Sequence, residues 1–158
     1  MEEIVADLDA SGVELQIAID NVERDFNMGT IVRSANAFGV RHIHIIGRRQ
    51  WNKRGAMMTD KYLHVHYYTE IEEFLQAITG STLVAVDNVQ GSIPLHTALL
   101  PQNTIFLFGA EGPGVRPELL DVASSVVAIE QFGSTRSLNV GVAAGIAMYA
   151  WLQRNRLN

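Results

Sequence analysis

The chain has 158 residues, of which 47% are hydrophobic and 18% charged, which is ordinary for a single globular domain with a substantial core. It has no cysteine, so disulfides and thiolate zinc sites are excluded. The net charge of −5 argues against a protein that binds nucleic acid over its whole surface.

Short apolar runs alternate with helical stretches along the chain. The runs are rich in Val, Ile, Phe and Tyr, and they predict strands at 14–19, 42–46, 63–68, 83–87, 104–109 and 125–130. Helices are predicted at 27–38, 70–79, 116–123 and 137–153, with Pro117 in the first turn of the third. This alternation predicts an α/β fold with a mostly parallel sheet flanked by helices.

Four polar or glycine-rich segments follow predicted strands. They are residues 20–29, 87–92, 109–114 and 131–139. Ligands of parallel α/β sheets bind beyond the carboxyl ends of the strands. We therefore expect these segments to meet at one edge of the sheet and to form the functional site.

The first of these segments leads into a helix that carries an arginine. Asn27 can cap this helix, and Gly29 allows another group to approach the backbone closely. Arg33 lies about one and a half turns further on, among apolar neighbours, and its planar fork suits phosphate or carboxylate. The alternative is a surface arginine on an amphipathic helix.

Residues 109–114 read Gly-Ala-Glu-Gly-Pro-Gly and predict a rigid turn with an exposed backbone. The spacing differs from the dinucleotide-binding GxGxxG fingerprint, and no Walker GK[ST] follows. Glu111 could hold an arginine or bind a ligand, although a turn of purely structural use has the same composition.

Residues 133–139 bring two hydroxyls, a guanidinium and an amide to the start of the last, apolar helix. A helix start presents unpaired N–H groups and partial positive charge, which suits a ligand oxygen. Ser137 as the N-cap is the alternative without a ligand. Asn139 then still needs a partner or a ligand.

Eight of the twelve basic residues lie between positions 24 and 61, and only Asp25 and Asp60 oppose them, which gives this segment a net charge of +6. The eight are Arg24, Arg33, Arg41, Arg48, Arg49, Lys53, Arg54 and Lys61. Such clustering predicts a local patch for a phosphate backbone, with a solvated loop as the alternative.

Two histidine pairs at alternate strand positions, His42 with His44 and His64 with His66, each share one face. Such pairs can bind metal, but no carboxylate lies nearby in the sequence to complete a site, so strand packing or RNA contact is favoured. The absence of GxSxG argues against a serine nucleophile.

The two ends of the chain lack membrane and export signals. MEEIVADLDA at the N-terminus is acidic and has no apolar run, and the apolar residues 138–152 are too few to cross a bilayer. We expect a cytoplasmic protein with no membrane partner.

Three segments together resemble the motifs of the SpoU/TrmH family of RNA 2′-O-ribose methyltransferases, of the SPOUT class. They are NMGTIVRSANAFGV at 27–40, IFLFGAEGPGV at 105–115 and STRSLNVGVAAGIAMYA at 134–150. The resemblance implies a C-terminal trefoil knot, bound S-adenosyl-L-methionine that leaves as S-adenosyl-L-homocysteine, no metal, and a homodimer. It also implies one SPOUT domain over residues 1–158, without a separate RNA-binding extension. The nearly all-apolar last helix gives a physical reason for the dimer, with burial in a single core as the alternative.

The resemblance also assigns roles to residues. The catalytic set is Arg33, Asn27, Glu111, Ser137 and Asn139. The cofactor-binding set is Val86, Asp87, Gly109, Glu111, Ile129, Ser137 and Leu138. The RNA-binding set comes from the clustering of basic residues described above, and it is Arg24, Arg33, Arg48, Arg49, Lys53 and Arg54. In the family, the arginine that matches Arg33 is regarded as the group that activates the ribose hydroxyl. Because arginine normally stays protonated, electrostatic stabilisation of the alkoxide is the less demanding role, and both roles stay open.

The expected substrate is RNA, with tRNA favoured because a small domain with a +6 segment can hold a compact folded RNA. Ribosomal RNA stays open, as does methylation of a base in place of a ribose. A catalytically silent RNA-binding module is the alternative of another class. A nicotinamide-dependent oxidoreductase is disfavoured because its fingerprint is missing.

Overall fold

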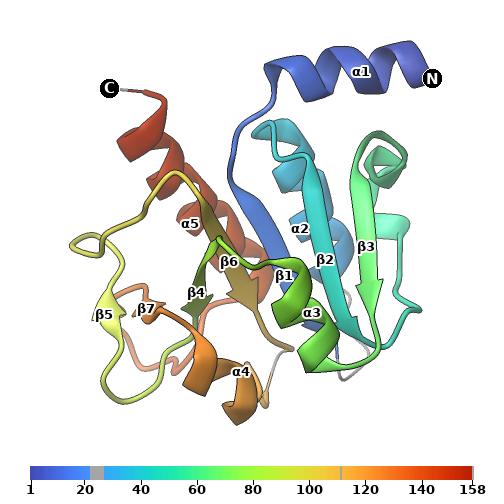
Figure 1. Ribbon diagram of the computed structural model, residues 1–158. Coiled ribbons are helices and arrows are strands. Elements are labelled where there is room, and N and C mark those ends of the chain that lie inside the picture. Colours follow the sequence, from blue (N-terminus) through green and yellow to red (C-terminus); the bar gives the residue numbers. More distant parts are fainter. Residues whose placement is uncertain (22–26, 111, 158) are drawn as a thin grey trace.

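A seven-stranded parallel sheet forms the centre of the computed structural model, which describes residues 1–21, 27–110 and 112–157 (Figure 1). The strands are β1 Gln16–Asn21, β2 His42–Gly47, β3 His64–Tyr68, β4 Thr82–Val86, β5 Ile93–Pro94, β6 Thr104–Phe108 and β7 Ser125–Ala128. Their order in the sheet is β3-β2-β1-β6-β4-β7-β5. All carboxyl ends therefore lie along one edge.

Helices cover both faces of this sheet. The α-helices are α1 Glu2–Ser11, α2 Asn27–Ala37, α3 Ile71–Ala77, α4 Pro117–Val122 and α5 Val140–Asn155, and the 3₁₀ helices are η1 Arg54–Ala56 and η2 Thr59–Tyr62. Helices α2 and α5 pack on one face, and α3 and α4 on the other. None of the helices among the described residues is long and apolar enough to span a membrane.

Alternation along the buried strands builds the two cores. Ile17 and Ile19 of β1 face α2 and α5, whereas Ala18 between them belongs to the core under α3 and α4. In β6, Phe106 and Leu107 divide between the faces in the same way. Because both faces are covered, successive residues in the middle of these strands are apolar, as is typical of parallel sheets.

The predicted parallel α/β fold is confirmed, with two additions and one correction. Helix α1 was not predicted, and none of its residues is buried. Strand β5 has only two residues. The last helix starts at Val140 and not at 137, because Asn139 caps it. The trefoil knot stays a prediction.

The four histidines of β2 and β3 form a stacked cluster on one face of the sheet edge. The ring centroids of His42 and His66 lie 5.3 Å apart, and those of His44 and His66 lie 5.0 Å apart. At the outer end, His64 Nε2 lies 3.0 Å from the Asp9 carboxylate, which links α1 to β3. Strand packing is therefore the arrangement observed, and no group of three or more His, Asp or Glu side chains among residues 1–21, 27–110 and 112–157 is arranged so that it could hold a metal ion.

His44 is the most enclosed ring of this cluster. Its Nε2 lies 2.6 Å from Gln16 Oε1, and its Nδ1 lies 3.0 Å from Tyr68 Oη. A neutral ring satisfies both bonds, with Nε2–H donating to the amide oxygen and Nδ1 accepting from the phenol. Burial, together with the neighbouring His66 and His42, lowers the pKa of His44 from its ordinary 6.5 to about 3.

This lowered pKa predicts a loss of stability in acid. The unfolded chain takes up a proton at His44 below pH 6.5, whereas the folded protein does so only near pH 3. The stabilisation is complete above pH 6.5 and decreases between pH 6.5 and 3, by up to about 1.4 kcal/mol per pH unit. In urea unfolding at pH 7 and pH 4.5, His44→Phe should show a markedly smaller decrease than the wild type. Tyr68→Phe keeps the titrating ring and should retain the wild-type decrease, so equal decreases in all three proteins would contradict this role of His44.

Candidate active site

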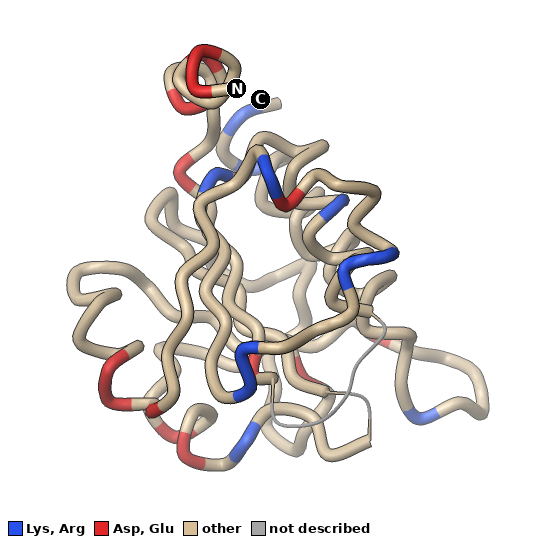
Figure 2. Tube along the Cα trace, turned by 90° about the vertical axis from the view of Figure 1, so that its right-hand side faces the viewer, with Lys and Arg blue, Asp and Glu red and all other residues tan. Residues whose placement is uncertain are grey.

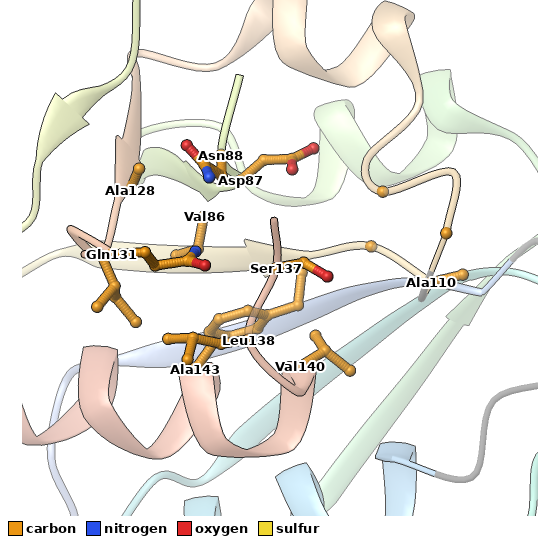
Figure 3. A pocket seen from close by; sticks show the side chains of 15 residues that line it. Val86, Asp87, Asn88, Ala110, Ala128, Gln131, Ser137, Leu138, Val140 and Ala143 are labelled. Carbon is orange, nitrogen blue, oxygen red and sulfur yellow. The ribbon is translucent and has the colours of Figure 1, made fainter. Parts of the chain in front are cut away.

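A pocket opens at the carboxyl ends of β4, β6 and β7 and is closed on one side by the start of α5 (Figure 3). Its volume is about 160 Å³. Six residues predicted to bind the cofactor line it, namely Val86, Asp87, Gly109, Ile129, Ser137 and Leu138. Segments more than 50 positions apart in the sequence thus form one cavity. This convergence agrees with the expectation that the segments following the strands meet at one edge of the sheet and form a ligand site.

The pocket lining combines apolar walls with a few polar groups. Phe108 and Val140 line it, as do Asn88 and Gln131, and none of these four was in the predicted cofactor-binding set, although Asn88 and Gln131 lie in the predicted segments 87–92 and 131–139. Figure 3 shows the Asn88, Gln131 and Ser137 side chains around the pocket, the first from the segment after β4 and the other two from the segment after β7. Apolar walls suit a planar heterocycle, and amide and hydroxyl groups suit a polar tail. Because closed ligand sites typically measure about 300–1,000 Å³, a ligand of cofactor size would extend beyond these walls.

The glycine turn after β6 is folded back on itself. Ala110 and Gly114 form an antiparallel bridge, and Gly112 and Gly114 have positive φ angles of 90° and 71°. A Cβ added to Gly109 would lie 2.1 Å from the carbonyl carbon of Gly114. Only glycine at 109 allows this close contact, so the shape of the pocket floor depends on it.

Two aspartates hold the end of this turn, Asp20 in β1 and Asp87 directly after β4, and β1 and β4 are the two strands that flank β6. Asp87 Oδ2 accepts a hydrogen bond of 3.1 Å from the Val115 backbone N–H. Buried Asp20 accepts hydrogen bonds from Arg116 Nε and from the Arg116 backbone N–H, at 2.9 and 3.0 Å. Asp87 therefore shapes the turn as well as lining the pocket. The Asp20–Arg116 pair was not predicted, because nothing local in the sequence links residues 96 positions apart.

The start of α5 joins the pocket to α2. The Asn139 side-chain oxygen accepts a 3.1 Å hydrogen bond from the Val142 N–H, so Asn139, and not Ser137, is the N-cap. The amide nitrogen of Asn139 donates to Asn27 Oδ1 at 3.0 Å. Two residues predicted to belong to one site are thus in direct contact. Ser137 lies outside the helix, with its side chain at the pocket.

Arg33 lies on α2 outside the pocket lining. Thr30, one turn before it, packs against Gly141, and the Phe38 ring lies 6.3 Å from that of Tyr149, so α2 runs alongside α5. Within the part of the chain that the structure describes, the exposed Arg33 guanidinium makes no hydrogen bond or ion pair. The structure therefore places Arg33 beside α5 and free to bind, but not within the pocket of the same chain.

The loop after β2 carries the predicted basic patch. Arg48, Arg49, Lys53 and Arg54 are exposed, and Figure 2, which looks onto the β3 side, shows basic positions spread over this side of the molecule. The Arg49 guanidinium lies 4.5 Å from the centre of the Tyr67 ring.

Two residues of the basic segment, Arg41 and Lys53, form ion pairs within the chain. Arg41 is buried and pairs with Asp9 at 2.8 Å, so it does not belong to the exposed patch. Lys53 is exposed but pairs with Asp60 at 3.3 Å. The predicted site residues Glu111 and Arg24 lie outside the described residues.

Several known proteins that are similar to this chain are described as RNA methyltransferases. A curated tRNA (guanosine(18)-2'-O)-methyltransferase of Aquifex aeolicus is 28% identical over 149 residues, which cover 90% of this chain and 70% of the relative. An AdoMet-bound rRNA methyltransferase structure from Sinorhizobium meliloti has a TM-score of 0.79 at 26% identity, covering 89% of this chain and 56% of that one. A third similar protein is a structure whose description concerns the 2-OH methylation of C/U34 on tRNA. It has a TM-score of 0.81 at 25% identity, and the match covers 91% of this chain and 97% of that one.

The fold and the pocket thus define an RNA methyltransferase of the SPOUT class. The sequence profile of the SpoU rRNA Methylase family matches residues 14–149. The chain belongs to this family, and the resemblance seen in its three motifs is confirmed.

Proposed function

We propose that this chain transfers a methyl group from S-adenosyl-L-methionine to a ribose 2′-hydroxyl of RNA, with tRNA as the favoured substrate. The observation that supports this most strongly is the convergence of the motif segments: glycines of the second motif and residues 137, 138 and 140 of the third line one pocket, and Asn139 bonds to Asn27 of the first motif. Membership of a methylase family and the AdoMet-bound relative support the same reaction.

The cofactor would be held by the mixed pocket lining. Val86, Ile129 and Leu138 offer apolar contact to the adenine ring, while Ser137 and Gln131 offer hydrogen bonds to polar groups. Gly109 leaves room for the ligand and exposes backbone. When bound, S-adenosyl-L-methionine supplies a methyl group on a sulfonium centre.

Arg33 is proposed to bind the phosphate next to the target nucleotide and to stabilise the negative charge that develops on the 2′-oxygen. A guanidinium stays protonated at neutral pH, so electrostatic stabilisation is favoured over proton abstraction. Asn27, Ser137 and Asn139 would position Arg33 or the nucleotide. Glu111 stays a predicted member of this set.

A homodimer through α5 is part of the proposal. Val142, Ile146 and Tyr149 form an exposed apolar stripe on α5, with exposed fractions of 54%, 42% and 47%. Such a stripe on a helix of a folded domain indicates a protein interface. Helix α2, which carries Arg33, runs alongside α5, and Arg33 does not line the pocket of its own chain. Pairing of two chains along α5 would therefore bring Arg33 of each chain to the interface.

Ile146→Arg places a charge in the middle of this stripe. We expect the variant to sediment as a monomer at concentrations at which the wild type is dimeric, and to lose most methyl transfer. Val122→Arg, at a similarly exposed apolar position on α4, should leave sedimentation unchanged. A monomeric wild type, or a dimeric Ile146→Arg protein, would contradict this interface.

The decisive experiment combines cofactor binding with product analysis. Calorimetry should show saturable binding of S-adenosyl-L-methionine to the purified chain. After incubation with tRNA and, separately, with rRNA, digestion and mass analysis of the nucleosides should give a 2′-O-methylated nucleoside. A methylated base would show a base-methylating enzyme, and absence of cofactor binding would favour the silent RNA-binding module.

Other parts of the proposal rest on the family or on the sequence. The relatives act on different nucleotides by their descriptions, guanosine 18 and C/U34 of tRNA, and the product analysis distinguishes a methylated guanosine from a methylated cytidine or uridine. Action of residues 1–158 as one methyltransferase domain, a cytoplasmic location and independence from metal stay predictions.

A further inference from the structure

Two consecutive methionines occupy a backbone conformation that side chains disfavour. Met57 and Met58, called here the methionine tip, have φ angles of 51° and 65°, and they are the non-glycine residues with positive φ among residues 1–21, 27–110 and 112–157. Their exposed fractions are 64% and 61%. A strained turn that presents two large apolar side chains to solvent indicates a use outside the folding of the chain.

The methionine tip is held firmly in place. The turn before it packs on α2 so closely that a Cβ on Gly29 would lie 2.9 Å from the Gly55 Cα. Thr59 Oγ1 donates to the Ala56 carbonyl at 2.6 Å, across the tip. The tip is therefore mounted on the first turns of the helix that carries Asn27 and Arg33.

Positive charge surrounds the methionine tip in the sequence. Lys53, Arg54 and Lys61 are all exposed. The acidic residue near it, Asp60, is paired with Lys53. Arg48 and Arg49 extend the basic loop toward β2. An apolar tip within a basic surface is complementary to nucleic acid, in which apolar base faces are flanked by phosphates.

We propose that Met57 and Met58 contact unstacked nucleobases of the RNA substrate while the surrounding cations hold its phosphates. The flexible, polarisable thioether side chain adapts to different flat apolar surfaces, and single-stranded loops expose such faces. This inference rests on the proposed RNA methylation, and it makes the tip a determinant of which RNA regions are accepted.

The test uses the double variant Met57→Gly/Met58→Gly. Glycine adopts positive φ freely, so the melting temperature should stay within about 2 °C of the wild type or rise. The affinity for tRNA, measured by fluorescence anisotropy, should fall about tenfold. Met57→Leu/Met58→Leu keeps apolar surface and should retain most of the affinity. Leu99→Ala removes an apolar side chain that is 88% exposed and should have no effect.

The salt dependence separates apolar contact from charge. The tRNA affinity of the glycine double variant should be lower than that of the wild type by the same factor at 50 and at 200 mM salt. Arg48→Ala/Arg49→Ala should instead lower the slope of log affinity against log salt. Cofactor binding by calorimetry, measured in parallel, should be unchanged in the glycine variant.

These readouts distinguish the failure of this inference from failure of the proposed function. If the wild type binds S-adenosyl-L-methionine and methylates tRNA, but the glycine double variant binds tRNA as tightly, the inference is wrong. If the glycine double variant changes its oligomeric state but not its tRNA affinity, the inference is also wrong, because the methionine tip would then contact protein. A wild type that neither binds nor methylates RNA overturns both proposals.

Discussion

Replacing Arg33 by alanine is expected to lower the rate of methyl transfer by at least about 100-fold, the typical effect of removing a group that stabilises charge in a transition state. The affinity for S-adenosyl-L-methionine should stay within about twofold, because Arg33 does not line the pocket. The guanidinium is exposed and its removal leaves no buried partner, so the melting temperature should not change. Single-turnover kinetics with saturating RNA, together with calorimetry, measure these quantities.

Arg33→Lys then distinguishes the two possible roles of the arginine. Lysine keeps the charge but lacks the planar fork, so an electrostatic role predicts an intermediate rate that is flat with pH up to about 9. A proton-accepting role predicts a rate that rises with pH toward the lysine pKa of about 10.4. A wild-type rate in Arg33→Ala would show that the catalytic assignment of Arg33 is wrong.

Gly109→Ala is expected to abolish measurable cofactor binding. The added Cβ would lie 2.1 Å from the Gly114 carbonyl carbon and 2.3 Å from its oxygen. Backbone atoms cannot rotate away as a side chain can, so the turn must shift and the pocket floor with it. Overpacking of this kind typically costs about 1–3 kcal/mol, which lowers the melting temperature of a domain of this size by roughly 2–4 °C per kcal/mol.

Gly133→Ala is the matched control for this substitution. Gly133 lies in the segment that leads to Ser137, has no atom within 4 Å of an added Cβ, and has no positive φ. Its alanine variant should bind the cofactor and melt as the wild type does. Retention of cofactor binding in Gly109→Ala would show that the glycine turn does not shape the binding site.

Local patterns were sufficient to predict the elements that position the site. The apolar run of β6 and the glycines that follow it predict a buried strand ending in a turn, because backbone conformation and burial depend mainly on neighbouring residues. Pro117 indeed occupies the first turn of α4. The residues predicted for the cofactor came from the family resemblance. Those of the predicted cofactor-binding residues that the structure describes line one pocket, and their roles stay predictions.

The sequence pattern was not sufficient where a residue's role depends on a distant partner. Asn139 was expected to need a partner or a ligand, and only the structure shows that the partner is Asn27, 112 positions away, while the same side chain caps α5. Arg41 was counted with the basic segment, but its pairing with Asp9 leaves it buried. The pKa of His44 is lowered in the fold because the ring is buried, with His66 and His42 nearby adding to the effect.

The sequence by itself therefore determined the class of fold, the order of strands and helices along the chain apart from α1 and β5, and the family. Only the tertiary structure decided the spatial order β3-β2-β1-β6-β4-β7-β5 and, with it, which loop ends meet. The physical reason is that strand and turn preferences are local, whereas strand order follows from packing two helix layers on one sheet. Contacts such as Asp20 with Arg116 exist only after that packing has brought their strand ends together.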